Sequence, residues 1–279
     1  MPKRRPTKSH SSSRSGAKSS RKHRIEEDQR VHQINFTNKP YEEYKSFQEL
    51  IATLYGPTGI GKTTLAFSIP GCHILATEPV NNTKKFSHTR IPNWPTFKSF
   101  IDKMENNPDL LKDITMFAID TIEFLVSKCM STICYEWSLT DLSDEGFSRA
   151  WTELKQELIF NLLRLIDLGP GLLLISHQRQ RDSKVNRMVI KADTMDLSPS
   201  INNAISFLSS IILHMRYVDK SKTSAELGHL RCLSITGNEE EDAKDNTGLL
   251  SDACGSEPGI IKFRTEPIAV RKILRCFKD

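Results

Sequence analysis

Long apolar runs and closely spaced cysteine pairs are both missing from this chain of 279 residues. No apolar run approaches the roughly 20 residues that cross a bilayer, and the N-terminus lacks the apolar stretch of a secretory signal. The six cysteines are scattered and form no Cys-x-x-Cys pair of the kind that binds zinc. We therefore expect a cytoplasmic protein with reduced cysteines and no membrane partner.

Acidic residues are absent from residues 1–24, which hold nine Lys or Arg side chains. The rest of the chain has 30 basic and 34 acidic residues, so the net charge of +5 arises in this basic tail. A segment so poor in apolar residues cannot offset the entropy of ordering, which predicts a disordered tail over residues 1–32. Two interpretations stay open: a flexible arm that contacts nucleic acid, or a solvated tail without a partner.

Strand-like and helix-like segments alternate through residues 33–279. The pattern predicts strands over 50–55, 72–77, 114–119 and 171–176, and helices over 61–69, 96–105, 121–137 and 147–168. It also predicts a helix over 201–210 and strands over 211–218, 229–235 and 259–263. The polar, acidic residues 237–255 predict a mobile loop. Apolar strands separated by helices indicate one α/β domain whose mainly parallel sheet has helices on both faces.

A glycine-rich motif follows the first strand. Residues 56–63, GPTGIGKT, match G-x-x-x-x-G-K-[ST] at every fixed position, with a strand before and a helix after. The glycines let backbone N–H groups point at phosphate oxygens, and the helix dipole adds positive potential there. We expect Lys62 to reach the β- and γ-phosphates and the Thr63 hydroxyl to bind Mg²⁺. The residues expected to bind nucleotide, ATP in the first instance, are Gly56, Pro57, Thr58, Gly59, Ile60, Gly61, Lys62, Thr63 and Thr64.

Two carboxylates follow apolar strands and are candidates to complete this site. Asp120 ends the run MFAID and is expected to share Mg²⁺ with Thr63, because the metal at a P-loop needs a carboxylate in addition to the hydroxyl. The residue after Asp120 is Thr121, which has no carboxylate to act as a general base, so the base must come from elsewhere. Glu78 ends the run ILATE, and strand ends of a parallel sheet line the ligand crevice. Glu78 is therefore the expected base, with Glu123 the next candidate.

Three segments in order, ILATE (74–78), FAIDT (117–121) and LLLISH (172–177), make the chain resemble the RecA-type ATPase core. The resemblance is closest to phage-encoded AAA-type nucleotide-binding proteins related to RecA, some of which are recombinases or single-strand annealing proteins. It covers about residues 50–180 well. It implies a Mg²⁺-dependent ATPase with Lys62, Glu78 and His177 as catalytic residues, in which His177 reads the γ-phosphate. It also implies a homo-oligomer, a ring or a filament, that acts on single-stranded DNA, in the host cytoplasm if a phage encodes it.

Cations are concentrated after His177, in the segment QRQRDSKVNRMVIK. In RecA-like proteins the corresponding loop contacts single-stranded DNA, and clustered cations suit a phosphate backbone. The segment has no aromatic residue for stacking on bases, so a backbone-tracking role, a β-hairpin and a solvated basic loop all stay open. The residues expected to contact DNA are Arg179, Arg181, Lys184 and Arg187, with Lys191 nearby.

A neighbouring subunit usually completes each site of RecA-like and ring-helicase ATPases with a cation. In the ring helicases this cation resembles Lys-x-Arg before a Gly-containing turn, between late strands. This chain has Lys244 in KDNTG at that position, with Asn246 where the Arg would stand. Lys244 is thus the candidate trans-acting residue, and a solvated Lys in an acidic loop is the alternative.

The expected function is slow ATP hydrolysis coupled to DNA recombination or annealing. Two alternatives stay open: a nucleotide-gated binding or assembly protein with incidental turnover, and a motor ATPase of the ring-helicase kind. DNA-stimulated ATP hydrolysis separates the first function from the assembly protein, and processive unwinding separates the motor from both.

Overall fold

The computed structural model describes residues 46–79, 86–139, 147–185, 188–218, 230–255 and 257–277. The tail over residues 1–32 lies outside the described residues, so its disorder stays a prediction. Within the described ranges, no helix combines the length and the apolar character that crossing a membrane requires.

A central β-sheet has its strands in the order β10-β8-β7-β1-β5-β4-β2-β3. Neighbouring strands from β7 to β3 are parallel, whereas β8 pairs antiparallel with both β7 and β10. The strands from β7 to β3 are β7 (Ile211–Tyr217), β1 (Ile51–Gly56), β5 (Gly171–Val185), β4 (Met116–Asp120), β2 (Cys72–Ala76) and β3 (His88–Arg90). The others are β6 (Met188–Met195), β8 (Arg231–Ser234), β9 (Lys244–Asp245) and β10 (Ile260–Phe263), with β6 pairing β5 and β9 pairing β7.

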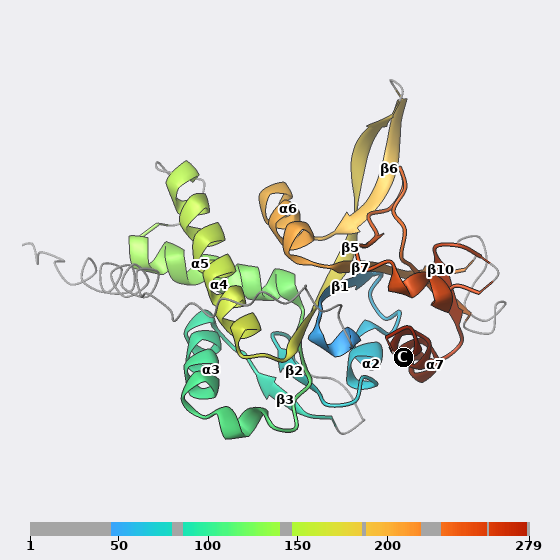
Figure 1. The fold of residues 1–279 in the computed structure, drawn as a ribbon. Helices are drawn as coiled ribbons and strands as arrows, with labels where there is room; N and C mark the ends of the chain where they lie inside the picture. The colour runs from blue at the N-terminus through green and yellow to red at the C-terminus, as the bar shows by residue number, and fades with distance from the viewer. Residues whose placement is uncertain are drawn as a thin grey trace, which may run out of the picture.

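Helices cover both faces of this sheet, and an apolar core lies between each helical layer and the strands (Figure 1). One layer holds α2 (Lys62–Phe67), α7 (Glu266–Arg275) and the 3-10 helix η3 (Leu249–Ala253). The other layer holds α3 (Trp94–Asn106), α4 (Ile122–Trp137), α5 (Phe147–Asp167) and α6 (Pro199–Leu208). Two more 3-10 helices are η1 (Phe47–Glu49) and η2 (Pro108–Leu111). The predicted α/β fold, with a mainly parallel sheet covered on both faces, is confirmed.

Local chemistry explains where individual helices begin and what they bury. The Asn93 side chain caps α3 by accepting a hydrogen bond from the Thr96 N–H at 2.9 Å, and Pro95 suits the first turn, where an N–H is not needed. The apolar residues of α3 recur at three- and four-residue spacing, so that Phe97 and Ile101 are completely buried against the sheet.

The strand predicted over 171–176 is longer in the structure. β5 pairs with β1 and β4 in its first half and then, from Gln178 to Val185, pairs antiparallel with β6. Of the alternatives for the basic segment, the β-hairpin is therefore the one confirmed. Residues 178–184, QRQRDSK, contain no apolar residue, which explains why apolar periodicity did not extend the strand.

The mobile loop predicted over 237–255 is wrong. This segment forms β9, which pairs with β7, and η3, in which Leu250 is completely buried. Glu241, in an acidic run that suggested solvent, is also buried, because its carboxylate lies 2.6 Å from the ring of the buried His214. Partners distant in sequence therefore order this acidic segment. The predicted elements also omit β3, β6, β9 and α7.

Candidate active site

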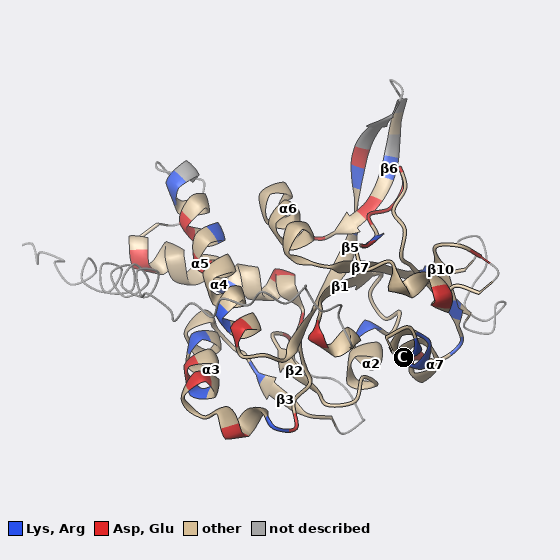
Figure 2. Ribbon diagram, in the orientation of Figure 1, with Lys and Arg blue, Asp and Glu red and all other residues tan. Residues whose placement is uncertain are grey.

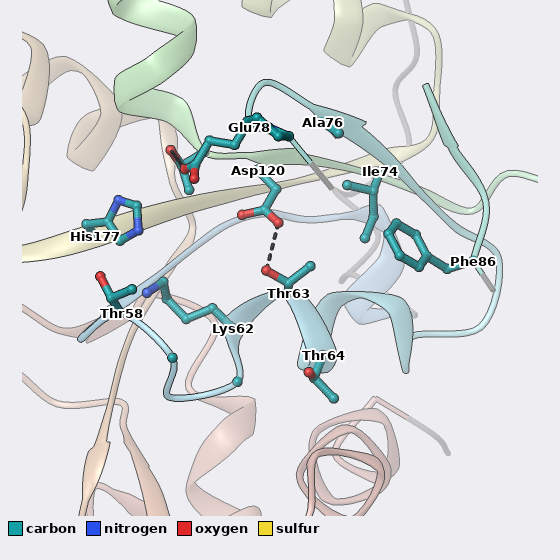
Figure 3. A pocket seen from close by; sticks show the side chains of 14 residues that line it. Thr58, Lys62, Thr63, Thr64, Ile74, Ala76, Glu78, Phe86, Asp120 and His177 are labelled. Atoms are coloured by element: carbon teal, nitrogen blue, oxygen red, sulfur yellow. Dashed lines mark hydrogen bonds between the residues drawn. The ribbon is translucent and has the colours of Figure 1, made fainter. Parts of the chain in front are cut away.

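The carboxyl ends of β1, β4 and β2 meet at one edge of the sheet, beside the point where β5 passes into the hairpin, and polar residues there line one cavity (Figure 3). The strand register explains this convergence, because Gly56 lies opposite His177, and Asp120 lies opposite Ala76, two residues before Glu78. The cavity has a volume of about 330 Å³. Of the predicted site residues, Thr58, Gly59, Gly61, Lys62, Thr63, Thr64, Glu78, Asp120 and His177 line it.

The P-loop wraps the N-terminus of α2. Gly59 and Gly61 have positive φ angles of 76° and 107°, which side-chain-bearing residues rarely adopt. The Lys62 ammonium donates to the carbonyls of Gly56 at 2.8 Å and Pro57 at 2.9 Å. Gly56 and Pro57 thus contact Lys62 through their carbonyls and do not line the cavity. Ile60 does not line it either, because its side chain is buried in the core.

The environment of Lys62 is matched to a triphosphate. Burial lowers the pKa of its ammonium, and the nearby carboxylates, Asp120 foremost, oppose this effect. A buried ammonium beside a glycine-rich loop that leads into a helix suits a polyanion.

A hydroxyl and a carboxylate lie together where a metal is expected. Thr63 Oγ1 donates to Asp120 Oδ2 at 2.7 Å (Figure 3). Burial raises the pKa of Asp120, and the hydrogen bond from Thr63 counteracts that effect. Mg²⁺ prefers oxygen ligands and is usually held by one or two protein groups plus phosphate and water, so this pair fits it.

Glu78 reaches the cavity from the end of β2 and is oriented by a neighbour. Its Oε1 accepts a hydrogen bond from Thr121 Oγ1 at 3.0 Å. Thr121 is itself fixed, because its N–H donates to Thr77 Oγ1 at 2.7 Å. The sequence interpretation did not give Thr121 this role, although its place directly after Asp120 was the available signal.

Glu123, on the first turn of α4, is the partner of His177. Its Oε1 lies 2.5 Å from His177 Nδ1 and accepts the His177 backbone N–H at 2.7 Å. Burial raises the pKa of Glu123, and its contacts with His177 counteract the rise. The pairing was missed from the sequence, where Glu123 was only a second candidate base. The pairing with Glu123 holds both the backbone and the imidazole of His177 in place.

The described cations of the hairpin are each paired with an acid, and Figure 2 shows both signs along it. Arg181 Nη2 lies 2.8 Å from Asp242 Oδ1, Arg179 Nη1 lies 4.0 Å from Asp196 Oδ1, and Lys191 pairs with Asp182. The Lys184 side chain and all of Arg187 lie outside the described residues.

Lys244 lies in β9 rather than in a loop. Its ammonium donates to the Ser206 carbonyl at 2.6 Å, within its own subunit, and burial lowers its pKa. To reach a neighbouring site, this side chain would have to leave that hydrogen bond, so the trans-acting role stays a prediction without structural support.

A comparison with protein families agrees with this geometry. The family model described as an AAA domain matches residues 48–247, which include the P-loop, Glu78, Asp120 and His177. No curated protein matches the chain. Because the match covers well over half of the sequence, the chain belongs to the AAA domain family of P-loop nucleotide-binding ATPases.

Proposed function

We propose that this protein is a Mg²⁺-dependent ATPase that acts on single-stranded DNA, in recombination or strand annealing of the kind that phage proteins carry out. It works in the cytoplasm as a homo-oligomer, a ring or a filament, and nucleotide state controls how the β5–β6 hairpin holds DNA. One observation carries this proposal: β5 passes from the cavity at His177 directly into the hairpin.

Hydrolysis has side chains in place for each task. The phosphates would replace the carbonyls of Gly56 and Pro57 as partners of Lys62. Thr63 and Asp120 would hold Mg²⁺, which when bound offsets negative charge on the phosphoryl oxygens.

The geometry favours Glu78 over Glu123 as the general base. Glu123 Oε1 is already within hydrogen-bond distance of two His177 nitrogens. Glu78 has only the Thr121 hydroxyl as a hydrogen-bond partner among the described residues, and its side chain lines the cavity. It is therefore the carboxylate better placed to orient water and accept its proton.

The continuity of β5 supports coupling between the cavity and the hairpin. His177 lies opposite Gly56, and the next residue, Gln178, is the first to pair with β6. Eight paired residues per strand span about 25 Å of extended chain, and Figure 1 shows the hairpin projecting beyond the sheet. A shift of His177 on γ-phosphate loss would be transmitted along one strand, with no intervening loop.

A buried polar network at the hairpin root supports the same coupling. Tyr55, the residue before the P-loop, donates its hydroxyl to the Asp242 carbonyl at 2.6 Å and stacks on His214 with ring centroids 4.5 Å apart. His214 also contacts the hairpin, because its Nε2 lies 3.0 Å from Oε1 of Gln178. Asp242 also pairs with Arg181 of the hairpin. The P-loop strand and the hairpin thus share partners.

The acidic partners of the hairpin cations can be replaced by a polyanion. Their salt bridges are exposed, with Arg179 39% and Arg181 45% accessible, and exposed ion pairs contribute about 0–1 kcal/mol. DNA phosphates can take over these cations at little cost, which predicts binding that is insensitive to sequence and sensitive to salt.

The test is the rate of ATP hydrolysis with no DNA, with a single-stranded oligonucleotide and with the matching duplex. We expect stimulation by the single strand. If DNA neither binds nor changes the rate, while ATP changes the particle size in light scattering, the protein is instead a nucleotide-gated assembly protein. Processive unwinding of a forked duplex would indicate a motor.

A further inference from the structure

An ion pair covers the P-loop on the side away from the cavity. Arg231, the first residue of β8, places its Nη1 2.5 Å from Oε1 of Glu266, the first residue of α7. Each side chain is only 12% exposed, and α7 packs on α2, the helix that follows the P-loop (Figure 1). Glu266 lies after residue 247, where the family match ends.

The same guanidinium holds the backbone of the P-loop. Arg231 Nη1 donates to the Ile60 carbonyl at 2.6 Å, and Nη2 donates to the Arg264 carbonyl at 3.0 Å. The peptide bond between Ile60 and Gly61 is trans, so its C=O and N–H point in opposite directions. Because Gly61 lines the cavity, a carbonyl held outward by Arg231 turns the Gly61 N–H inward, toward the phosphate position.

The contact with Gly61 is also tight. A Cβ added to Gly61 would lie 2.2 Å from Glu266 Oε1 and 2.6 Å from Arg231 Nη1. The ion pair therefore rests directly on the backbone of this residue, whose φ of 107° already favours glycine. Little room remains for the peptide plane to rotate while the pair is formed.

We propose that Arg231 and Glu266 are positioning residues for nucleotide binding, which orient the Gly61 N–H as a phosphate donor. The inference rests on the ATP site proposed above and adds the C-terminal helix α7 to its determinants. The two charges cancel, so the pair contributes alignment rather than net attraction for a triphosphate. Arg231 also lies over the Phe263 ring, 5.2 Å from its centroid, which fixes the plane of its guanidinium.

The test is calorimetric titration of the full chain with Mg·ATP, together with steady-state kinetics. Arg231→Met should weaken ATP binding about 10-fold, the worth of one hydrogen bond to a charged group. The KM for ATP should rise while kcat stays within about twofold, because the residues that act on the γ-phosphate are intact. Arg231→Lys, which keeps the charge but cannot reach all three acceptors, should recover only part of the affinity.

Glu266→Ala separates alignment from charge. Coulomb's law alone says that removing a negative charge near a triphosphate tightens binding. The proposal expects weaker binding, because Arg231 loses its anchor. Tighter binding by Glu266→Ala would therefore contradict it.

Arg164→Met is the matched control, because Arg164 is 15% exposed and pairs with Asp102 and Glu105, away from the P-loop. It should lower stability without changing ATP affinity. If Arg231→Met also loses only stability and binds ATP like wild type, the positioning role is wrong and the ATP site stands. If wild type binds no ATP, or Lys62→Ala binds it equally well, the proposed function fails and the inference fails with it.

Discussion

Replacing Asp120 by Asn should leave the nucleotide-free protein at least as stable as wild type at pH 8. Burial is the largest influence on the pKa of Asp120, and it raises that pKa above the ordinary value of 3.8. A carboxyl group whose pKa is raised by folding stabilises the protein below its unfolded pKa and loses that contribution as pH rises through the folded pKa. Asn is neutral at every pH and keeps an oxygen for the Thr63 hydroxyl, so the difference should shrink toward pH 4.

The same substitution should remove most of the stabilisation by Mg·ATP. Wild type at a ligand concentration of 100 Kd gains about 2.7 kcal/mol, which for a chain of this size raises Tm by roughly 5–10 °C. Changes to groups that only orient a metal ligand already weaken metal binding by about 10–100-fold, and Asp120 would be a direct ligand. With a Kd raised about 100-fold, the same ligand concentration adds about 0.4 kcal/mol, or roughly 1 °C in Tm.

The assay is a thermal melt of both proteins at pH 4.5 and pH 8, with and without Mg·ATP. Asp109→Asn is the control, because Asp109 is 87% exposed and pairs with Lys112 at the surface. Each of its melts should match the corresponding melt of wild type. A full Mg·ATP shift in Asp120→Asn would refute the metal role of Asp120. A lower Tm at pH 8 without nucleotide would refute the argument from burial.

Three further variants test the rest of the proposal. Glu78→Gln should keep ATP binding but lower phosphate release by about 10²–10⁴, the usual worth of a general base, and a near-normal rate would move the base to Glu123. Neutralising three hairpin cations should weaken binding to all DNA sequences and reduce the salt slope by up to about 0.7 per lost contact; if only deletion of residues 1–24 has this effect, the arm is the DNA site. The three cations are Arg179, Arg181 and Lys184. Lys244→Ala should retain ATP binding by an isolated subunit but lower DNA-stimulated turnover, and mixing it with Glu78→Gln should restore part of the rate. Wild-type turnover by Lys244→Ala alone would contradict a trans-acting role.

The parts of the site that follow from local rules were predictable from the sequence. The P-loop has fixed glycines between a strand and a helix, so the sequence around it is enough to predict where it lies and what it binds. Asp120, Glu78 and His177 each follow an apolar strand, and parallel strands bring their carboxyl ends to one edge. The observed register, with Gly56 opposite His177 and Asp120 opposite Ala76, is the consequence of that rule.

The acidic segment over 237–255 shows why local composition fails elsewhere. Its charges predicted solvent exposure, yet Glu241 is buried because His214 and Arg216 of β7 face it. Arg216 is 25 residues away in sequence, and nothing near Glu241 in the sequence reveals that these two side chains lie beside it. A buried acid is tolerated only with such partners, so its burial is decided by the tertiary fold.

The same limit applies to what surrounds a recognisable motif. Ile60 and Arg231 are 171 residues apart in the chain, and Glu266 is a further 35 residues on. Every P-loop of this pattern can turn its N–H groups toward phosphate, but how firmly each peptide plane is held depends on the groups behind it. The motif therefore predicts that phosphate binds, whereas the affinity also depends on contacts from outside the motif, such as those of Arg231. If the Arg231 variants behave as expected, about a tenfold factor in the ATP affinity of this site comes from the Arg231–Glu266 pair, which lies outside the motif.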